Sequence, residues 1–294
     1  MLINQTPIEN HLNEFGLLVK REDLSCPPPG PPFSKTRGVF AHIKKRPEKV
    51  IGVLDTYHSQ AGHAVAAACK LLGKECINFY PVRKADAGKG LQPQQGAAQA
   101  LGAHMYPIQA GRSAILFHQA KKHLEEYRDQ HNDVYMMPNA LKLPEMVAQT
   151  ASEAYDTWKQ LQHGAGYGIY PEPRTVLIAI SSGTIAAGVI KGILDRVTAT
   201  RATHSMPRFI LHMGYNRSEE TVMEYMANMG DLNLAAGSPL NVQLVNEKYS
   251  YGDVAKAGID PRWPCNQYYD LKAFRWWLAV GRAIYGEALL WNIG

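Results

Sequence analysis

The sequence of 294 residues lacks paired cysteines, and this absence excludes two common ways of stabilising a chain. The four cysteines are scattered, with no Cys-x-x-Cys pair: Cys26, Cys69, Cys76 and Cys265. Structural zinc sites use closely spaced ligand pairs, and disulfide scaffolds are typical of much shorter secreted chains. We therefore expect neither a metal site nor a disulfide framework.

Long hydrophobic runs are also missing. No apolar run approaches the ~20 residues that a membrane span requires. The first 16 residues are polar and mildly acidic, without the apolar core of a signal peptide. These absences predict a cytoplasmic protein without a membrane partner.

Charged residues are scarce as well, at 19% of the chain, while hydrophobic residues make up 46%. This balance excludes a disordered chain, and 25 glycines and 18 prolines exclude a long coiled coil. With 31 Lys+Arg against 26 Asp+Glu, the net charge is +5. A charge this small does not by itself indicate a nucleic-acid partner.

Strand-like and helix-like segments alternate along most of the chain. Strands are predicted at 50–54, 75–80, 103–108, 134–137, 175–180, 208–213 and 241–245, with helices at 62–72, 91–101, 113–130, 144–161, 184–197 and 218–229. This alternation predicts an α/β fold with parallel sheets flanked by helices. Ligands of such sheets bind at the carboxyl ends of strands, so the turns at 55–63, 138–143 and 181–188 are candidate sites.

The turn at 181–188 follows the most apolar predicted strand and opens a helix. Ser181, Ser182, Gly183 and Thr184 combine small side chains with hydroxyl donors at a helix start, which favours a bound phosphate. The turn lacks both a GK[ST] element and a GxGxxG pattern, so it is neither a Walker loop nor a dinucleotide fingerprint. An ordinary capped helix that packs small residues on the sheet is the alternative.

Four segments in order carry a resemblance to a known family. They are KREDL (20–24) leading into FSKTRG (33–38), HSQAGHAVA (58–66) with KLLG (70–73), the turn at 181–188, and YYDLKAF (268–274). Together they resemble the pyridoxal-phosphate enzymes of fold type II, such as threonine dehydratase, serine racemase, aminocyclopropane-carboxylate deaminase and D-cysteine desulfhydrase. The resemblance implies pyridoxal 5′-phosphate (PLP) as the cofactor. It also implies a larger cofactor-binding domain of residues 1–36 plus 145–294, and a smaller inserted domain of residues 37–144.

The resemblance assigns Lys35 as the Schiff-base lysine. Five prolines within residues 26–32 predict a stiff segment before it, either a surface connector or an arm that holds the lysine. Gln60 stands where relatives have an asparagine that contacts the cofactor ring, and it is one methylene longer. Ser181, Ser182, Gly183 and Thr184 match the phosphate loop, while Ser59 is expected at the substrate.

The C-terminal segment provides two further candidates. By the resemblance, Asp270 lies by the pyridine nitrogen, where many relatives place a neutral hydroxyl. A carboxylate there keeps the ring protonated and makes it a strong electron sink, although Asp270 also suits a helix N-cap. Tyr269 is expected to stack on the substrate or transfer protons there, with a core tyrosine as the alternative.

Three hypotheses for function follow. The first is a PLP-dependent lyase or deaminase that acts at Cα of an amino acid through an external aldimine and a carbanion. The second is a decarboxylase for an amino acid attached to thymine in bacteriophage DNA, in the host cytoplasm. The basic charge and Asp270 favour it, with possible phosphate contacts from Lys44, Lys45, Arg46, Lys121 and Lys122. The third is an inactive binding protein of the same fold, for which Gln60 is an argument.

The expected partners follow from these hypotheses: an amino-acid-like small molecule, or an amino-acid-modified nucleotide or DNA. Four of the five tryptophans lie within residues 263–294. Aromatic residues are enriched at subunit interfaces, and we therefore also expect a homodimer.

Overall fold

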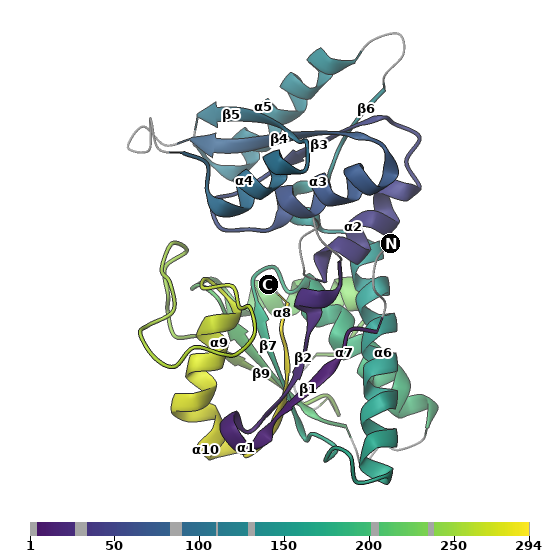
Figure 1. Ribbon diagram of the computed structural model, residues 1–294, viewed down its shortest axis with the longest axis vertical. Helices are drawn as coiled ribbons and strands as arrows, with labels where there is room; N and C mark the ends of the chain where they lie inside the picture. Colours follow the sequence, from purple (N-terminus) through teal and green to yellow (C-terminus); the bar gives the residue numbers. More distant parts are fainter. Residues whose placement is uncertain are drawn as a thin grey trace. The chain divides into compact units, whose positions relative to one another are not determined.

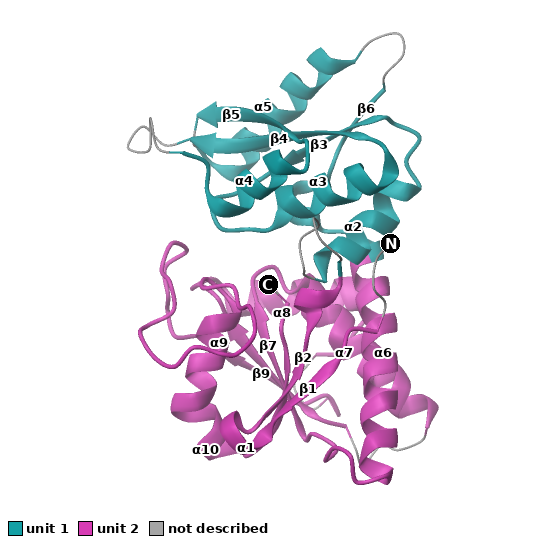
Figure 2. Ribbon diagram, in the orientation of Figure 1, with its two compact units in different colours: residues 1, 26–145 teal, residues 2–25, 146–294 magenta. Residues whose placement is uncertain are grey.

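The computed structural model describes residues 5–26, 34–82, 90–109, 111–128, 133–200, 206–234 and 238–293. The chain divides into two compact units, a smaller one of residues 26–145 and a larger one of residues 2–25 and 146–294 (Figure 2). Residues 34–36 belong to the smaller unit, whereas sequence analysis assigns them to the larger domain. Residues 27–33 of the proline-rich segment lie outside the described residues.

The smaller unit contains a parallel sheet with strand order β5-β4-β3-β6 (Figure 1). Its strands are β3 (Val50–Leu54), β4 (Glu75–Val82), β5 (His104–Gln109) and β6 (Val134–Met136). Its helices are α2 (Lys35–Lys44), α3 (Ala61–Leu72), α4 (Pro93–Ala100) and α5 (Ser113–Leu124), with 3-10 turns η3 (Glu125–Tyr127) and η4 (Asn139–Leu141). Helix α5 covers one face of the sheet, where Leu116 and Leu124 pack with Ile77 and Phe79. Helix α3 contacts the same strands β3 and β4 and also packs against α2 and α4.

The larger unit contains a sheet with strand order β1-β2-β10-β7-β8-β9, in which only the pair β1–β2 of the described strands is antiparallel (Figure 1). Its strands are β1 (Ile8–His11), β2 (Leu17–Lys20), β7 (Thr175–Ile180), β8 (Arg208–Met213), β9 (Val242–Val245) and β10 (Ala288–Trp291). Its longer helices are α6 (Pro144–Gly166), α7 (Thr184–Ala199) and α8 (Glu219–Gly230). Shorter ones are α1 (Leu12–Phe15), η1 (Glu22–Leu24), α9 (Asp270–Trp276), the π-turn η6 (Trp277–Gly281) and α10 (Arg282–Tyr285).

Strand β7 is buried at every position, as expected of a parallel strand whose two faces are both covered. On one face, Leu177 and Ala179 pack in a cluster with Phe274 and Trp277 of the C-terminal helices. Figure 1 shows α9 and α10 on this side of the sheet, and α6 and α7 on the other. The predicted α/β class with parallel-rich sheets is confirmed.

Strands β1, β2 and β10 were not predicted from the sequence. Strands β2 and β10 are buried at all four positions, so neither shows the alternation of apolar and polar residues that indicates a strand. Strand β10 lies between β2 and β7, so both ends of the chain enter the same sheet. Among the described residues, none of the helices combines the length and apolar character needed to span a membrane.

Candidate active site

Lys35 is the first residue of helix α2 and is half-buried. Its neighbours Ser34, Thr36 and Arg37 are buried, so the lysine is the accessible position of this helix start. The charge of Lys35 acts on the carboxyl group of Asp55 at the end of β3. The start of α2 and the turn after β3 therefore lie within electrostatic range of each other.

Ser59 and Gln60 lie in the turn that joins β3 to α3. The Ser59 hydroxyl accepts a hydrogen bond from the backbone N–H of Ala61 at 3.1 Å. The Gln60 Oε1 lies 3.2 Å from the His63 Nδ1, one helical turn further on. This contact folds the extra methylene of Gln60 back toward the helix and fixes the direction of its amide.

Asp55 is the first residue of the candidate turn 55–63, but sequence analysis assigned it no individual role. Its side chain is 1% exposed. Burial raises the pKa of Asp55 to about 6, although hydrogen bonds from Thr56, Asn78 and Gly62 act in the opposite direction. A lone aspartate after a strand carries no motif, so only the structure identifies it.

The predicted phosphate loop connects β7 to α7. Ser182 Oγ and Thr184 Oγ1 share a hydrogen bond at 3.0 Å, and Thr184 Oγ1 shares another with the Tyr225 hydroxyl at 2.9 Å. Gly183 has φ +91°, and a Cβ there would lie 2.6 Å from the Met226 Cγ. The loop can therefore keep this shape only with glycine at its centre.

Two residues of the loop's surroundings were missed by sequence analysis, Tyr225 and Arg217. The Arg217 Nη1 donates to the Ser181 carbonyl at 2.8 Å. Burial raises the pKa of Tyr225, which keeps its phenol protonated. Three hydroxyl groups and a guanidinium at the start of a 16-residue helix are donors that fit a phosphate group. Both residues come from the segment after β8, and neither has a recognisable spacing to the loop.

Tyr269 packs in the core of the larger unit and is 5% exposed. Its hydroxyl makes a side-chain hydrogen bond with Ser181 of the predicted phosphate loop. Burial raises the pKa of Tyr269, so its phenol is neutral at physiological pH. Tyr269 thus packs in the hydrophobic core and also contacts the predicted phosphate loop.

Asp270 opens helix α9 and is fully buried. One of its oxygens, Oδ1, accepts a hydrogen bond from the backbone N–H of Ile293 at 3.0 Å. Burial raises the pKa of the Cys265 thiol, and the charge of Asp270 raises it further. A carboxyl group held by a backbone donor at this position fits the nitrogen of a pyridine ring as a partner.

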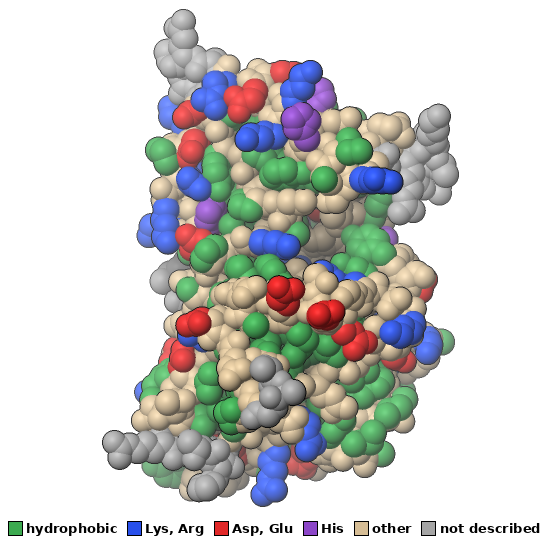
Figure 3. Space-filling model, turned by 180° about the vertical axis from the view of Figure 1, so that it is seen from behind, with side chains coloured by type: hydrophobic (Ala, Val, Ile, Leu, Met, Phe, Trp, Pro, Cys, Tyr) green, Lys and Arg blue, Asp and Glu red, His purple; other side chains and the backbone are tan. Residues whose placement is uncertain are grey.

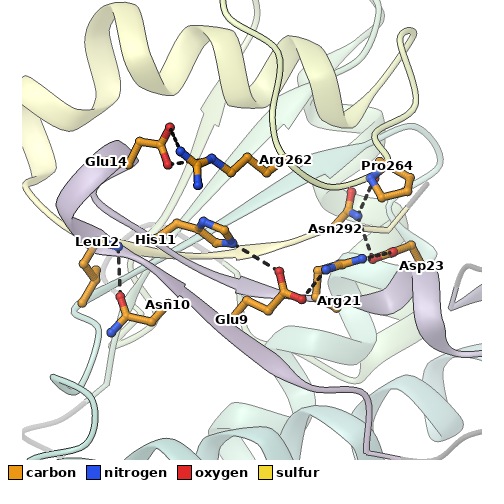
Figure 4. Close-up of polar contacts among 10 residues, drawn as sticks. All are labelled: Glu9, Asn10, His11, Leu12, Glu14, Arg21, Asp23, Arg262, Pro264 and Asn292. Carbon is orange, nitrogen blue, oxygen red and sulfur yellow. Dashed lines mark hydrogen bonds and ion pairs between the residues drawn. The ribbon is translucent and has the colours of Figure 1, made fainter.

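Arg21 and Asp23 of the KREDL segment take part in a partly buried polar network in the larger unit (Figure 4). Arg21 donates to Asp23 at 2.7 Å and also pairs with Glu9. The Asn292 Nδ2 donates to Asp23 Oδ1 at 3.3 Å and to the Pro264 carbonyl at 2.8 Å. Because Ile293, the residue after Asn292, holds Asp270, this network supports the start of α9.

The predicted site residues thus form two groups, described unit by unit. In the smaller unit, Lys35 lies at one helix start and Ser59 and Gln60 precede another. In the larger unit, the structure brings Tyr269 and Ser181 into contact. The other predicted site residues of the larger unit are Ser182, Gly183, Thr184 and Asp270.

The basic residues considered for phosphate contacts are partly engaged within the protein. Lys45 pairs with Glu145 at 3.1 Å, and the Arg46 guanidinium lies 3.9 Å from the centre of the Tyr135 ring. Lys44, Lys121 and Lys122 are exposed. On the face drawn in Figure 3, lysine and arginine side chains are scattered among acidic and hydrophobic ones. Among the described residues, no cluster of three or more His, Cys, Asp or Glu side chains could hold a metal ion.

Comparisons with known proteins give three results. Residues 1–229 match the family model described as pyridoxal-phosphate dependent enzyme. The chain is 45% identical over 299 residues to the "Glycyl-dTMP PLP-dependent decarboxylase" of Pseudomonas phage M6, covering 100% of both chains. Among solved structures, it resembles an ACC deaminase homologue, with TM-score 0.71 and 17% identity over 100% of this chain and 90% of the other.

A second structural neighbour is the apo diaminopropionate ammonia lyase of Escherichia coli, with TM-score 0.64 and 14% identity over 99% of this chain and 82% of the other. At such identities the two neighbours establish the fold. The family match covers most of the chain. The donors around the predicted phosphate loop, together with Asp270, suit the cofactor of that family. The chain belongs to the family of pyridoxal-phosphate-dependent enzymes, and its cofactor is pyridoxal 5′-phosphate.

Proposed function

We propose that this protein is a PLP-dependent decarboxylase that acts on a glycine moiety joined to a thymidine nucleotide. The observation that carries the proposal is the 45% identity, over the full length of both chains, to a phage enzyme named for that substrate. This reverses the order of the hypotheses from the sequence, where a deaminase came first. The family match also argues against an inactive binding protein.

The fully buried Asp270 supports the same choice. When bound, PLP draws electrons from the bond that breaks at Cα. A carboxylate at position 270 holds the proton on the ring nitrogen, which strengthens this electron withdrawal. Loss of CO₂ leaves a full negative charge at Cα without a leaving group beyond it, so the reaction needs a strong electron sink.

The other candidate residues bind and move protons in this proposal. Lys35 holds the cofactor through its amino group and moves a proton at Cα. The hydroxyl groups of Ser182 and Thr184, with the start of α7, bind the phosphate. Tyr269 is a neutral phenol that can donate a proton to the substrate, and Ser59 contacts the substrate from the β3–α3 turn.

A direct test follows CO₂ and ammonia separately. The purified protein with added PLP is incubated with glycyl-dTMP, with free glycine, and with DNA that carries the same modified base. We expect CO₂ from the modified nucleotide and none from glycine. Ammonia release in place of CO₂ would restore the deaminase hypothesis, and a reaction on DNA alone, weakened by salt, would identify the polymer as substrate.

Lys35→Ala tests the assignment of the reactive lysine. We expect loss of the absorbance band of the lysine-bound cofactor and a fall in kcat of at least about 10³-fold. Lys49→Ala, at an exposed lysine of the same unit, is the control and should keep both. A covalently bound cofactor in Lys35→Ala would contradict the assignment.

The proposal extends to assembly and location. The larger unit supplies the predicted phosphate loop and Asp270 to cofactor binding, and the protein acts as a homodimer in the host cytoplasm. Val280 and Ile284 support the dimer, because they expose 42% and 62% of apolar side chains near the C-terminal helices. Light scattering measures the molar mass of wild type and of Ile284→Glu. We expect a dimeric wild type and a weakened dimer in the variant, and a monomeric wild type would contradict the proposal.

A further inference from the structure

The buried carboxyl group of Asp55 has no role in the function proposed above. It lies at the end of β3 and makes hydrogen bonds at both ends of the following turn. Its Oδ1 accepts from the backbone N–H of Thr56 at 2.8 Å, and the backbone of Gly62 also donates to the carboxylate. Its Oδ2 accepts from the Asn78 Nδ2 at 3.2 Å. The carboxylate therefore ties the first residue of the turn to the start of α3.

The start of α3 is packed directly on this carboxylate. A Cβ on Gly62 would lie 2.3 Å from the Asp55 Oδ2 and 2.2 Å from the Asn78 Nδ2. Both side chains are buried, at 1% and 0% exposure. The bonds to Asp55 therefore anchor the turn at both of its ends, Thr56 and Gly62.

A buried carboxylate with a raised pKa is costly for the folded protein, and such groups concentrate at functional sites. Burial raises the pKa of Asp55 to about 6, and the nearby charge of Lys35 lowers it. Two other polar groups face the carboxyl: the Asn78 amide and the Cys76 thiol, whose pKa is raised partly by Asp55. Lys35 is the nearby cation that favours the charged carboxylate.

We propose that Asp55 is a positioning residue of this enzyme. Its carboxylate fixes the turn that carries Ser59 and Gln60, and its negative charge interacts electrostatically with the amino group of Lys35. The inference rests on the proposed function, because that function assigns Ser59 to the substrate and Lys35 to the cofactor. Asp55 itself touches neither the cofactor nor the substrate in this proposal.

The test compares Asp55→Asn with Asp133→Asn in the full chain, with and without PLP. Asp133 is a matched control, because it also accepts from the next backbone N–H, at 3.0 Å from Val134, but lies on the surface. Hydrogen exchange reports the order of residues 56–62. The pH titration of the absorbance of the lysine-bound cofactor reports the charge near Lys35.

In Asp55→Asn we expect exchange at residues 56–62 to accelerate about tenfold, because local opening loses hydrogen bonds that hold the turn. We expect the midpoint of the absorbance titration to fall by about one pH unit, since a negative charge near a cation is removed. Asp133→Asn should match wild type in both measurements. Wild-type behaviour of Asp55→Asn in the exchange or in the titration would overturn the proposal.

Two further arms keep the test decisive. If Asp55→Asn does not fold, Asn78→Ala removes only the donor to Oδ2, and a smaller acceleration at the same residues is expected. Unchanged exchange in Asn78→Ala would then overturn the proposal. A failure of the proposed function would look different. If the wild-type protein neither released CO₂ nor bound PLP, hydrogen exchange without PLP would still report whether Asp55 orders the turn.

Discussion

The two units assemble their candidate residues in different ways. In the smaller unit, the interacting groups lie within one stretch of chain, from Lys35 through Asp55 to Asn78. In the larger unit, they come from distant segments: the β7–α7 loop is completed by Tyr225, and Asn292 bonds to Asp23 across the length of the chain.

This difference has a physical consequence. A site built from neighbouring residues can open locally, because breaking its bonds releases only one turn. A site built from distant segments closes large loops of chain, so its contacts form only when the whole sheet is in place. We therefore expect changes in the smaller unit to act locally and changes in the larger unit to affect binding and stability together.

Within the larger unit, the largest expected effect concerns Asp270. Asp270→Asn keeps an oxygen that can accept the bond from Ile293 but removes the negative charge. We expect kcat to fall about 10²- to 10³-fold, the scale of losing one preorganised electrostatic contact. Steady-state rates of CO₂ release, with PLP saturating, measure this.

Asp253→Asn is the control for this substitution. Asp253 also accepts a backbone bond, at 2.6 Å from Ser250, but its side chain is exposed. Its variant should keep the wild-type rate. A rate for Asp270→Asn within twofold of wild type would remove Asp270 from the reaction and leave it a structural role.

The second prediction tests the smaller unit through the pH dependence of stability. The pKa of Asp55 is raised from 3.8 to about 6. The folded state therefore binds the proton more tightly than the unfolded state, and the stabilisation by this proton is present below pH 3.8 and lost as pH rises through about 6. At 1.36 kcal/mol per unit of pKa, the loss is about 3 kcal/mol.

The free energy of unfolding of Asp55→Asn, minus that of wild type, should therefore increase by about this amount between pH 3.5 and 7. Denaturant titrations at several pH values measure the difference. Asp133→Asn should give a much flatter difference over the same range. A flat difference for Asp55→Asn would mean that its carboxyl group is not held in an environment that disfavours the charge.

The same contrast explains how much the sequence could predict. The apolar strand at 175–180 and the small residues that follow it are local features, and both boundaries of β7 were predicted correctly. Lys35, at the start of α2, was selected because its flanking residues resemble a family motif, and its role stays a prediction. Tyr225 and Arg217 were missed because their contacts with the loop depend on how α8 packs on α7, which no local pattern encodes.

Strand β10 illustrates the limit most clearly. Its four residues, Ala288–Trp291, pair with β2 near the other end of the chain and with β7. All four residues of β10 are buried, so the segment lacks the alternation of apolar and polar residues that marks a half-buried strand. No role was assigned to Asp55 for another reason. Its importance depends on its burial and on its hydrogen bond with the Asn78 amide, and neither can be seen from one aspartate in a sequence.

The smallest predicted effect tests whether the loop of the larger unit couples binding to stability. Gly183→Ala places a Cβ at φ +91°, 2.6 Å from the Met226 Cγ. We expect the free energy of unfolding to fall by about 2 kcal/mol from backbone strain, and the affinity for PLP to fall with it. Gly96→Ala is the control, because Gly96 lies in helix α4 with nothing within 4 Å of an added Cβ.

Alanine at position 96 should stabilise the protein by about 0.5–1 kcal/mol, as helix propensity dictates, and leave PLP binding unchanged. Thermal unfolding with and without PLP measures both variants. If Gly183→Ala bound PLP as tightly as wild type while losing stability, the loop would be a structural element only. The phosphate would then have to be bound elsewhere, and the larger unit would lose its proposed role. A parallel loss of affinity and stability is what a binding loop held by distant contacts with α8 requires.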